Sequence, residues 1–350
     1  MSTTTNGAAP LVHDAWYVVA RSEDVTSSPM ARTVLGRSIV MYRTTGGQAV
    51  VLPDRCSHRG YPLSQGQVVG DNLQCGYHGF VFDCSGTCVS VPGQTAIPSK
   101  ANIAAFPSVE RGPFLWAWMG DPERADLTAV PAVEQLEEEG WTFVTGEVLL
   151  RCDYGLLVDN LLDLSHETYV HAATIGSPEV AEAPITTEFD KEAGVVHVSR
   201  QMEGVQCPAF FERFTGLRTP IDRGQDIEYY APGLYLLHVS LAPAAGEGVE
   251  VTDDQRYRIR VFYAITPAAA STTNYFFGMA RDFGHDQPEL SELFDKSQHA
   301  LIAEDAAALE ILQAAIDAEG WPSEVSIKID TGGLAGRRAL ARLAGGAGDA

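Results

Sequence analysis

The chain has 350 residues, 45% of them hydrophobic, and its 24 basic and 46 acidic side chains give a formal net charge of −22. A surface this acidic repels phosphate backbones and anionic lipid, which argues against nucleic acid and membrane surfaces as partners. No run reaches the roughly 18 consecutive apolar residues of a membrane span, and the polar start MSTTTNGAAPLVHDAW does not resemble a signal peptide. We therefore expect a cytoplasmic protein with neither nucleic-acid nor membrane partners.

The first third of the sequence is typical of an all-β domain. Short apolar runs are separated by Gly, Pro, Ser and Asp, namely WYVVA, SIVMY, AVVLP, FVFDC and FLWAWMG. The composition then becomes charged and proline-containing. These changes predict a β domain over 12–121 and a linker over 122–141.

Two mixed pairs of Cys and His stand inside this β domain. They read Cys56-x-His58 and Cys75-x-x-His78 on Gly-containing loops. Disulfides are uncommon in a cytoplasmic protein, so Cys close to His indicates a metal site or catalysis. Zinc is the most common metal for such a set, but zinc fingers usually pair Cys with Cys and His with His.

The remainder, 142–343, mixes strands with helices. Strand-like segments include TFVTGEVLLRCDY, VVHVSRQM, GLYLLHVSLAP, YRIRVFYAITP and NYFFGMARDF, while GLLVDNLLDLSHETYVH is helical in character. A long amphipathic helix is predicted over roughly 287–318. This order favours an α+β domain in which a helix packs on one face of an antiparallel sheet.

A second candidate metal site is indicated by His166 and His171. They are five residues apart, or about 140° around a regular helix, so both reach one metal only if the helix ends or bulges between them. Asp305 supplies a carboxylate and is preferred to Glu304, because it falls inside the apolar stripe of the long helix, where an unpaired charge is costly. Two His and one carboxylate form a facial triad for Fe(II) that leaves positions open for O₂.

Together these motifs resemble the Rieske non-haem iron oxygenases. The resemblance includes the run Asn160-x-x-Asp163-x-x-His166-x-x-x-x-His171. It is closest to the vanillate O-demethylase oxygenase family, through WYVVA at 16–20, LLVDNLLDLSHETYVHA at 156–172, GMARDF at 278–283 and IDTGGLAGRRAL at 329–340.

The resemblance implies a Rieske domain followed by a helix-grip catalytic domain. It implies a [2Fe–2S] cluster held by Cys56, His58, Cys75 and His78. It further implies a mononuclear Fe(II) held by His166, His171 and Asp305. High-potential Rieske proteins add a disulfide between the cluster loops, and this chain has Tyr61 and Tyr77 at the matching positions.

Two further residues acquire roles from the resemblance. Asp163 matches a carboxylate that connects an iron-ligand His to a Rieske His of the neighbouring subunit in a ring-shaped homotrimer. Its spacing from His166 would place both on one helical face, as expected for a group that orients the imidazole. Asn160 matches a position near the iron, although capping of the local backbone is an equally good interpretation.

The implied enzyme is a terminal monooxygenase that uses O₂. Electrons come from NADH through a separate flavin and [2Fe–2S] reductase, because the chain has no GxGxxG fingerprint of its own. The expected reaction is O-demethylation of vanillate to protocatechuate and formaldehyde. The alternatives are a related enzyme acting on isovanillate, another methoxybenzoate, a methylbenzenesulfonate or a phenoxybenzoate, and an electron carrier or redox sensor without mononuclear iron.

The substrate pocket is the least determined feature of the sequence. Apolar strand residues should grip the aromatic ring, and the candidates are Leu237, His238 and Tyr263. An aryl carboxylate would need a cation. Three arginines are available, although a surface ion pair is the more common role for such residues: Arg223, Arg258 and Arg260.

Overall fold

The computed structural model describes residues 7–133, 136, 138–218, 220–245 and 251–346. The described chain divides into two compact units. The first comprises His13–Ala132 with Thr266–Ala270, and the second comprises the residues before His13 and the rest of the chain after Ala132. The division after Ala132 falls within the segment predicted as a linker, 122–141.

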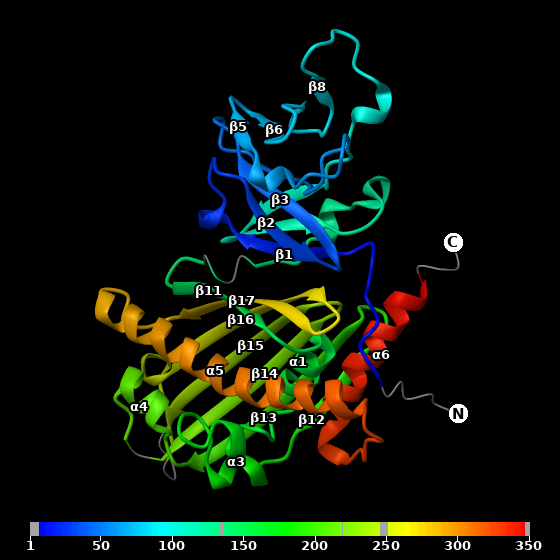
Figure 1. The fold of residues 1–350 in the computed structure, drawn as a ribbon. Coiled ribbons are helices and arrows are strands. Elements are labelled where there is room, and N and C mark those ends of the chain that lie inside the picture. The colour runs from blue at the N-terminus through cyan, green and yellow to red at the C-terminus, as the bar shows by residue number, and fades with distance from the viewer. Residues whose placement is uncertain (1–6, 134–135, 137, 219, 246–250, 347–350) are drawn as a thin grey trace. The chain divides into compact units, whose positions relative to one another are not determined.

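The first unit is all-β, as predicted. Its strands form three antiparallel sheets with the orders β1-β10-β9, β2-β3-β4 and β5-β6-β7-β8. Figure 1 shows this unit in blue to green. The strands are β1 (Trp16–Arg21), β2 (Met30–Val34), β3 (Arg37–Arg43), β4 (Ala49–Pro53), β5 (Gln67–Val69), β6 (Asn72–Gln74), β7 (Val81–Phe82), β8 (Cys88–Ser90), β9 (Ser108–Arg111) and β10 (Phe114–Trp118).

An apolar cluster within this unit supports the two loops that carry the Cys and His pairs. Cys56 and Cys75 are themselves buried members of the cluster. They pack with side chains of the strands and turns beside them, including Leu52, Leu63 and Leu73, each of which has 0% exposure. Burial of these side chains fixes both loops on the sheets beneath them.

The second unit contains a seven-stranded antiparallel sheet, in the order β11-β17-β16-β15-β14-β13-β12. Its strands are β11 (Thr142–Leu150), β12 (Thr186–Asp190), β13 (Val195–Val205), β14 (Ile221–Tyr230), β15 (Leu234–Pro243), β16 (Tyr257–Ala269) and β17 (Thr272–Arg281). The end of β16 from Thr266 onward belongs to the first unit. An antiparallel sheet accompanied by helices confirms the predicted α+β class.

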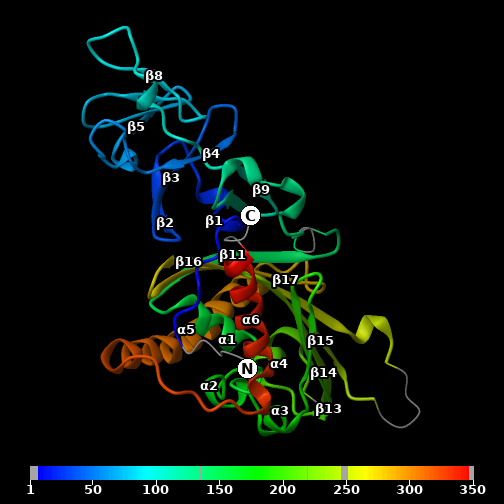
Figure 2. The same ribbon diagram turned by 90° about the vertical axis from the view of Figure 1, so that its right-hand side faces the viewer.

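Six α-helices of the described chain belong to this unit, and the longest lies across the sheet (Figures 1 and 2). The helices are α1 (Tyr154–Leu161), α2 (Glu167–Val170), α3 (Pro178–Glu182), α4 (Ala209–Thr215), α5 (Pro288–Glu319) and α6 (Thr331–Gly346). The buried face of α5 includes Phe294, Leu301 and Asp305, which confirms the predicted helix and the burial of Asp305. The predicted apolar stripe does not continue to Leu312, which is exposed. Among the described helices, none combines the length and apolarity needed to cross a membrane.

Glycines bring α6 close to α1. A Cβ atom at Gly332 would lie 2.4 Å from the carbonyl oxygen of Leu162, and one at Gly336 would lie 2.7 Å from a Leu162 methyl group. Such distances leave no room for a side chain. Arg337 of the same helix forms ion pairs with Asp159 of α1 and with Glu324. The TGGLAGR run of α6 therefore packs closely against α1, the helix that precedes the candidate iron site, and holds it in place.

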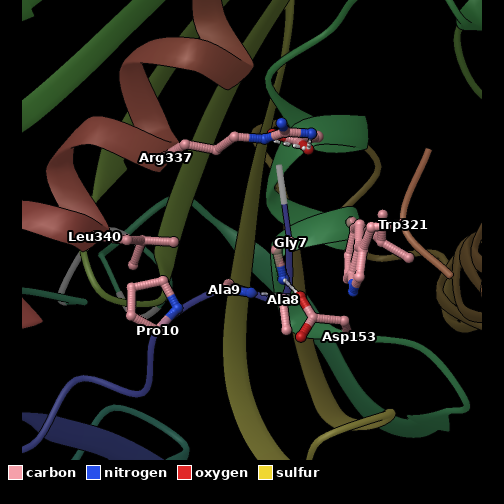
Figure 3. Close-up of a pocket in the computed structure, with 11 residues that line it drawn as sticks. Gly7, Ala8, Ala9, Pro10, Asp153, Trp321, Arg337 and Leu340 are labelled. Carbon is pink, nitrogen blue, oxygen red and sulfur yellow. Dashed lines mark hydrogen bonds and ion pairs between the residues drawn. The ribbon is translucent and has the colours of Figure 1, made fainter. Parts of the chain in front are cut away.

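A small cavity is lined by residues of the N-terminal segment, α1 and α6 (Figure 3). Its volume is about 20 Å³, and its lining includes Pro10, Asp153, Trp321 and Arg337. The amide of Ala9 donates to Asp153 Oδ1 at 3.3 Å, which ties the N-terminal segment to this wall. A space of this size holds about one water molecule, so the cavity is not a site for an aromatic substrate.

Candidate functional site

The two loops of the first unit share one backbone hydrogen-bond pattern. In each, the cysteine amide donates to the carbonyl five residues later, and the cysteine carbonyl accepts from a glycine amide four residues later, at 2.8–3.1 Å. Each glycine has a φ of +72°, a conformation that a residue with a side chain rarely adopts. The matching sets are Cys56, Gly60 and Tyr61 in one loop, and Cys75, Gly79 and Phe80 in the other.

The two loops bring their cysteines together and their histidines together. Cys56 and Cys75 are buried, whereas His58 and His78 are exposed, with ring centroids 4.6 Å apart. Burial raises the pKa of the Cys56 thiol to about 11, and the neighbouring Cys75 adds to the effect. Two inner sulfurs and two outer imidazoles fit a [2Fe–2S] cluster whose irons have different ligands.

No disulfide connects the two loops. All six cysteines are free thiols. Tyr61 and Tyr77 occupy the positions that match the disulfide cysteines of high-potential Rieske proteins, and their rings lie 5.5 Å apart.

The second unit brings His166, His171 and Asp305 together. One ligand atom from each lies within 4.8 Å of the others. Asp305 Oδ1 is 3.2 Å from His171 Nε2 and 3.5 Å from His166 Nε2. The three side chains have exposures of 16% for His166, 4% for His171 and 10% for Asp305. Two imidazoles and a carboxylate in this arrangement could hold one divalent iron.

The local backbone explains how both histidines reach one point. Helix α1 ends at Leu161, and a separate one-turn helix, α2, then lies between the two histidines. His166 immediately precedes α2 and His171 immediately follows it. The continuous helix therefore ends before the first histidine and not between the two, as the spacing had predicted, and the short helix α2 that lies between them ends immediately before His171.

Asp163 lies in the turn between α1 and α2. The expectation that it shares a helical face with His166 is therefore wrong, because no helix connects the two residues. Its carboxylate accepts a hydrogen bond from the Ser165 amide at 2.8 Å. Its backbone carbonyl, not its side chain, contacts His166 Nδ1, and this contact fixes the orientation of that imidazole.

Asn160 lies beside the candidate metal ligands. Its Nδ2 atom donates to Asp305 Oδ1 at 3.2 Å. Its Oδ1 atom is buried and has no hydrogen-bond partner within the described chain. An unsatisfied buried acceptor at this point suits a water molecule or another donor at the site.

Glu304 has a role that the sequence analysis did not assign. Its Oε2 lies 2.7 Å from His171 Nδ1 and accepts from Thr174 Oγ1 at 2.9 Å. Burial lowers the pKa of His171, but Asp305 and Glu304 outweigh it and raise this pKa to about 9. Two carboxylates around one imidazole make the site favourable for a cation. The adjacent Glu304-Asp305 pair was the available sequence signal.

A buried polar cluster adjoins the histidines, and of its members the sequence indicated only Arg223, as one of three possible cations for an aryl carboxylate. Glu167 has 4% exposure and forms ion pairs at 3.0 Å with Arg200 and Arg223. Gln225 donates to Glu167 at 2.7 Å. Burial raises the pKa of Glu167, but the charges of Arg223 and Arg200 hold it below its ordinary value. The only sequence signal was charged residues within otherwise apolar strands.

The three predicted pocket residues do not share a face of the sheet. Leu237 and Tyr263 pack against the same apolar cluster, and the Tyr263 hydroxyl accepts from Gln298 Nε2 at 2.6 Å. His238 follows Leu237 directly, so its side chain points to the opposite face. It pairs there with Arg260 across the sheet. The prediction that His238 lines the pocket with the other two is therefore wrong.

A hollow of about 440 Å³ opens beside the candidate iron site. Its lining includes Asp163, His166 and Arg337, together with the exposed apolar side chains of Leu312 and Val325. Asp163 and one histidine of the triad are therefore accessible from the surface of this unit.

Comparison with known proteins identifies the family. Residues 15–107 match the Rieske [2Fe–2S] domain, and residues 150–345 match the vanillate O-demethylase oxygenase C-terminal domain. The oxygenase subunit of vanillate O-demethylase from Pseudomonas sp. (strain ATCC 19151) is 38% identical, over 89% of this chain and 95% of the relative. The chain belongs to the vanillate O-demethylase oxygenase family.

Other relatives in this family have different substrates in their names. The oxygenase component of dicamba O-demethylase from Stenotrophomonas maltophilia is 34% identical, over 88% of this chain and 91% of the relative. A crystal structure of dicamba monooxygenase bound to 3,6-dichlorosalicylic acid superposes with a TM-score of 0.90 at 31% identity, covering 98% of this chain and all of that one. The predicted Rieske and catalytic domains are thereby confirmed.

Membership settles the enzyme class and the cofactors. The protein is a Rieske non-haem iron monooxygenase that uses a [2Fe–2S] cluster and a mononuclear iron. As the oxygenase component of a multi-component system, it works with a reductase. The reading of the Cys and His pairs as a zinc site is therefore wrong, and so is that of a carrier without mononuclear iron.

Proposed function

We propose that this family member O-demethylates vanillate. The supporting observation is that two vanillate O-demethylase oxygenase subunits match the chain almost from end to end, at 38% and 36% identity. In the overall reaction, vanillate, O₂, NADH and a proton give protocatechuate, formaldehyde, water and NAD⁺. NADH electrons reach the chain through a separate flavin and [2Fe–2S] reductase.

In this proposal His166, His171 and Asp305 hold the mononuclear iron, and Glu304 and the Asp163 carbonyl keep the two imidazoles oriented. When bound, the iron supplies the oxygen chemistry that hydroxylates the methoxy methyl group, and the resulting hemiacetal releases formaldehyde. Asn160 adjusts the space around Asp305 through its hydrogen bond to Oδ1. Leu237 and Tyr263 grip the ring from the apolar cluster that they share.

The [2Fe–2S] cluster is held by two residues from each loop of the first unit: Cys56, His58, Cys75 and His78. Both histidines are exposed, which suits transfer of electrons to a partner surface. We place that surface on a neighbouring copy of the chain in a homotrimer, where His78 meets Asp163. The hollow at Asp163, with its exposed Leu312 and Val325, provides apolar area for such an interface.

Metal analysis followed by turnover tests the proposal. The purified protein should contain about three irons and two sulfides per chain, with a Rieske-type EPR signal after reduction by dithionite. With a competent reductase, vanillate should yield equal amounts of protocatechuate and formaldehyde. The panel includes isovanillate, other methoxybenzoates, a methylbenzenesulfonate and a phenoxybenzoate. If one of these compounds is turned over and vanillate yields no protocatechuate, that compound and not vanillate is the substrate.

A further inference from the structure

The buried cluster around Glu167 carries more positive than negative charge. It contains the carboxylate of Glu167 and the guanidinium groups of Arg200 and Arg223, with the neutral amide of Gln225. All four residues have exposures of 4% or less. Buried charges in proteins are normally paired, because an unpaired one loses its hydration without replacement. One of the two arginines therefore lacks a full counter-charge.

Arg200 is fully engaged by the protein. Its Nε and one Nη donate to Gln225, the same Nη donates to Glu167, and the other Nη donates to two backbone carbonyls. These bonds use the five N–H donors that a guanidinium offers. The negative charge of Asp163 also stabilises the charged form of Arg200 and raises its pKa, although burial lowers this pKa more strongly. Arg200 has no donor left for a ligand.

Arg223 is different. One Nη donates to Glu167 and the other to the backbone carbonyl of Ile175, at 3.0 and 2.9 Å. Its Nε is buried and has no partner in the described part of the chain. Three of its five N–H donors are therefore unused. Its guanidinium lies 4.9 Å from the centroid of the Phe211 ring, so one side of it faces an aromatic surface.

The position of Arg223 connects the iron site with the apolar cluster. Its partner Glu167 is the residue directly after His166. Its cross-strand neighbour Leu241 belongs to the apolar cluster against which Leu237 and Tyr263 pack. The Tyr263 hydroxyl accepts from Gln298, which lies on the buried face of α5 together with Asp305.

The other candidate arginines do not suit a substrate at the iron. Arg258 is 41% exposed and pairs with Asp282, and Arg260 pairs with Glu138. Arg281 is buried, and two of its nitrogens lack a hydrogen-bond partner among the described residues, but it bonds to Ser291 on α5. Ser291 precedes Asp305 by 14 residues (305 − 291), which is about 21 Å along a helix. That distance is too long for a single-ring acid to span.

We propose that Arg223 binds the carboxylate of the aryl acid substrate, and thereby directs the opposite end of the ring toward the iron. The proposal rests on the proposed function for its substrate class. The carboxylate supplies the missing counter-charge and accepts from the free Nε and Nη donors, while Glu167 and Phe211 hold the guanidinium in place. An aryl acid is then preferred over the same ring without the acid group.

The test compares vanillate with guaiacol, which has the same ring, hydroxyl and methoxy groups but no carboxylate. Binding to the iron- and cluster-loaded protein is measured by calorimetry without reductase and without O₂, for wild type and Arg223→Met. Arg223→Met leaves Glu167 paired with Arg200 one to one, which favours folding. Arg258→Gln removes a positive charge from the surface as a control, and Arg223→Lys restores the charge without the planar fork.

The expected result is a vanillate Kd raised on the order of 10–100-fold in Arg223→Met, as for loss of a charged hydrogen bond. Guaiacol affinity should change less than about threefold, Arg223→Lys should recover part of the vanillate affinity, and Arg258→Gln should match wild type. KM for vanillate should rise more than kcat falls. Iron content should equal that of wild type.

Equal weakening of vanillate and guaiacol in Arg223→Met, or unchanged binding of both, would overturn the proposal. A wild-type protein that fails to demethylate vanillate, but binds another aryl carboxylate in an Arg223-dependent manner, overturns the proposed substrate and supports Arg223 as the anchor. If wild type demethylates vanillate but Arg223→Met weakens vanillate and guaiacol equally, the proposed substrate is supported and Arg223 as the carboxylate anchor is overturned.

Discussion

The two metal sites of this protein are constructed in opposite ways. The four proposed cluster ligands fall within 23 residues (56–78), on two loops with one shared hydrogen-bond pattern and with exposed histidines. The proposed iron ligands lie up to 139 positions apart (305 − 166), on two separate helical segments, and the carboxylate among them is buried. A site made locally depends on loop geometry, whereas a site made by tertiary packing depends on everything that holds its elements together.

The largest effect should come from breaking one site and leaving the other. Asp305→Ala removes the carboxylate that lies between both histidines, so we expect loss of mononuclear iron and of all measurable demethylation. The Rieske EPR signal and the sulfide content should stay at wild-type values. Metal analysis and EPR of the same sample check this.

Two controls sharpen that result. Glu292→Gln, on the exposed face of the same helix, should keep both metals and full activity. Cys56→Ser should give the mirror image, without cluster but with the iron site still able to take up Fe(II). Loss of both metals in Asp305→Ala or in Cys56→Ser would show that the two sites are not independent.

The next largest effect concerns communication between the sites. Asp163→Asn keeps the backbone carbonyl that contacts His166, so both metals should bind. It removes the charge proposed to bridge two subunits, and steady-state turnover should fall at least about 10–100-fold. Single-turnover oxidation of the pre-reduced cluster should slow by a similar factor. Full coupled activity in this variant would show that no bridge passes through Asp163.

Substitutions of Glu304 test whether its contact with His171 contributes to the affinity of the site for Fe(II). Glu304→Ala removes the acceptor at His171 Nδ1, and the affinity for Fe(II) should fall by roughly 10–100-fold. Glu304→Gln keeps an acceptor oxygen without the charge and should lose less. Iron titration monitored by calorimetry distinguishes the three proteins. Equal iron affinity in all of them contradicts the orienting role.

The smallest effect is expected in a cluster loop. Gly60→Ala puts a Cβ on a residue with a φ of +72° and 3.1 Å from Arg55 Nε, which should lower the free energy of unfolding by about 1 kcal/mol. Gly46→Ala, whose φ is not in the left-handed region, should change stability less. Thermal unfolding of the cluster-loaded protein checks both. If Gly60→Ala is as stable as wild type, the conformation of this loop does not depend on glycine at position 60.

The sequence determined the features that are local. The Cys and His pairs, the all-β character of the first unit and the long helix with Asp305 in its apolar stripe are visible because strand alternation, helix periodicity and loop spacing are short-range properties. The same holds for His166 and His171, whose spacing required the helix to end or bulge.

Only the tertiary structure decided what crosses between elements. It gave Glu304 its bond to His171, separated Asp163 from the helical face that spacing had suggested, and turned His238 away from Leu237 and Tyr263. It also revealed that Arg223, which the sequence could not distinguish from a surface arginine, is buried beside Glu167. Sequence spacing is silent on such pairs, because the register of strands and the packing of helices bring together residues that are far apart in the chain.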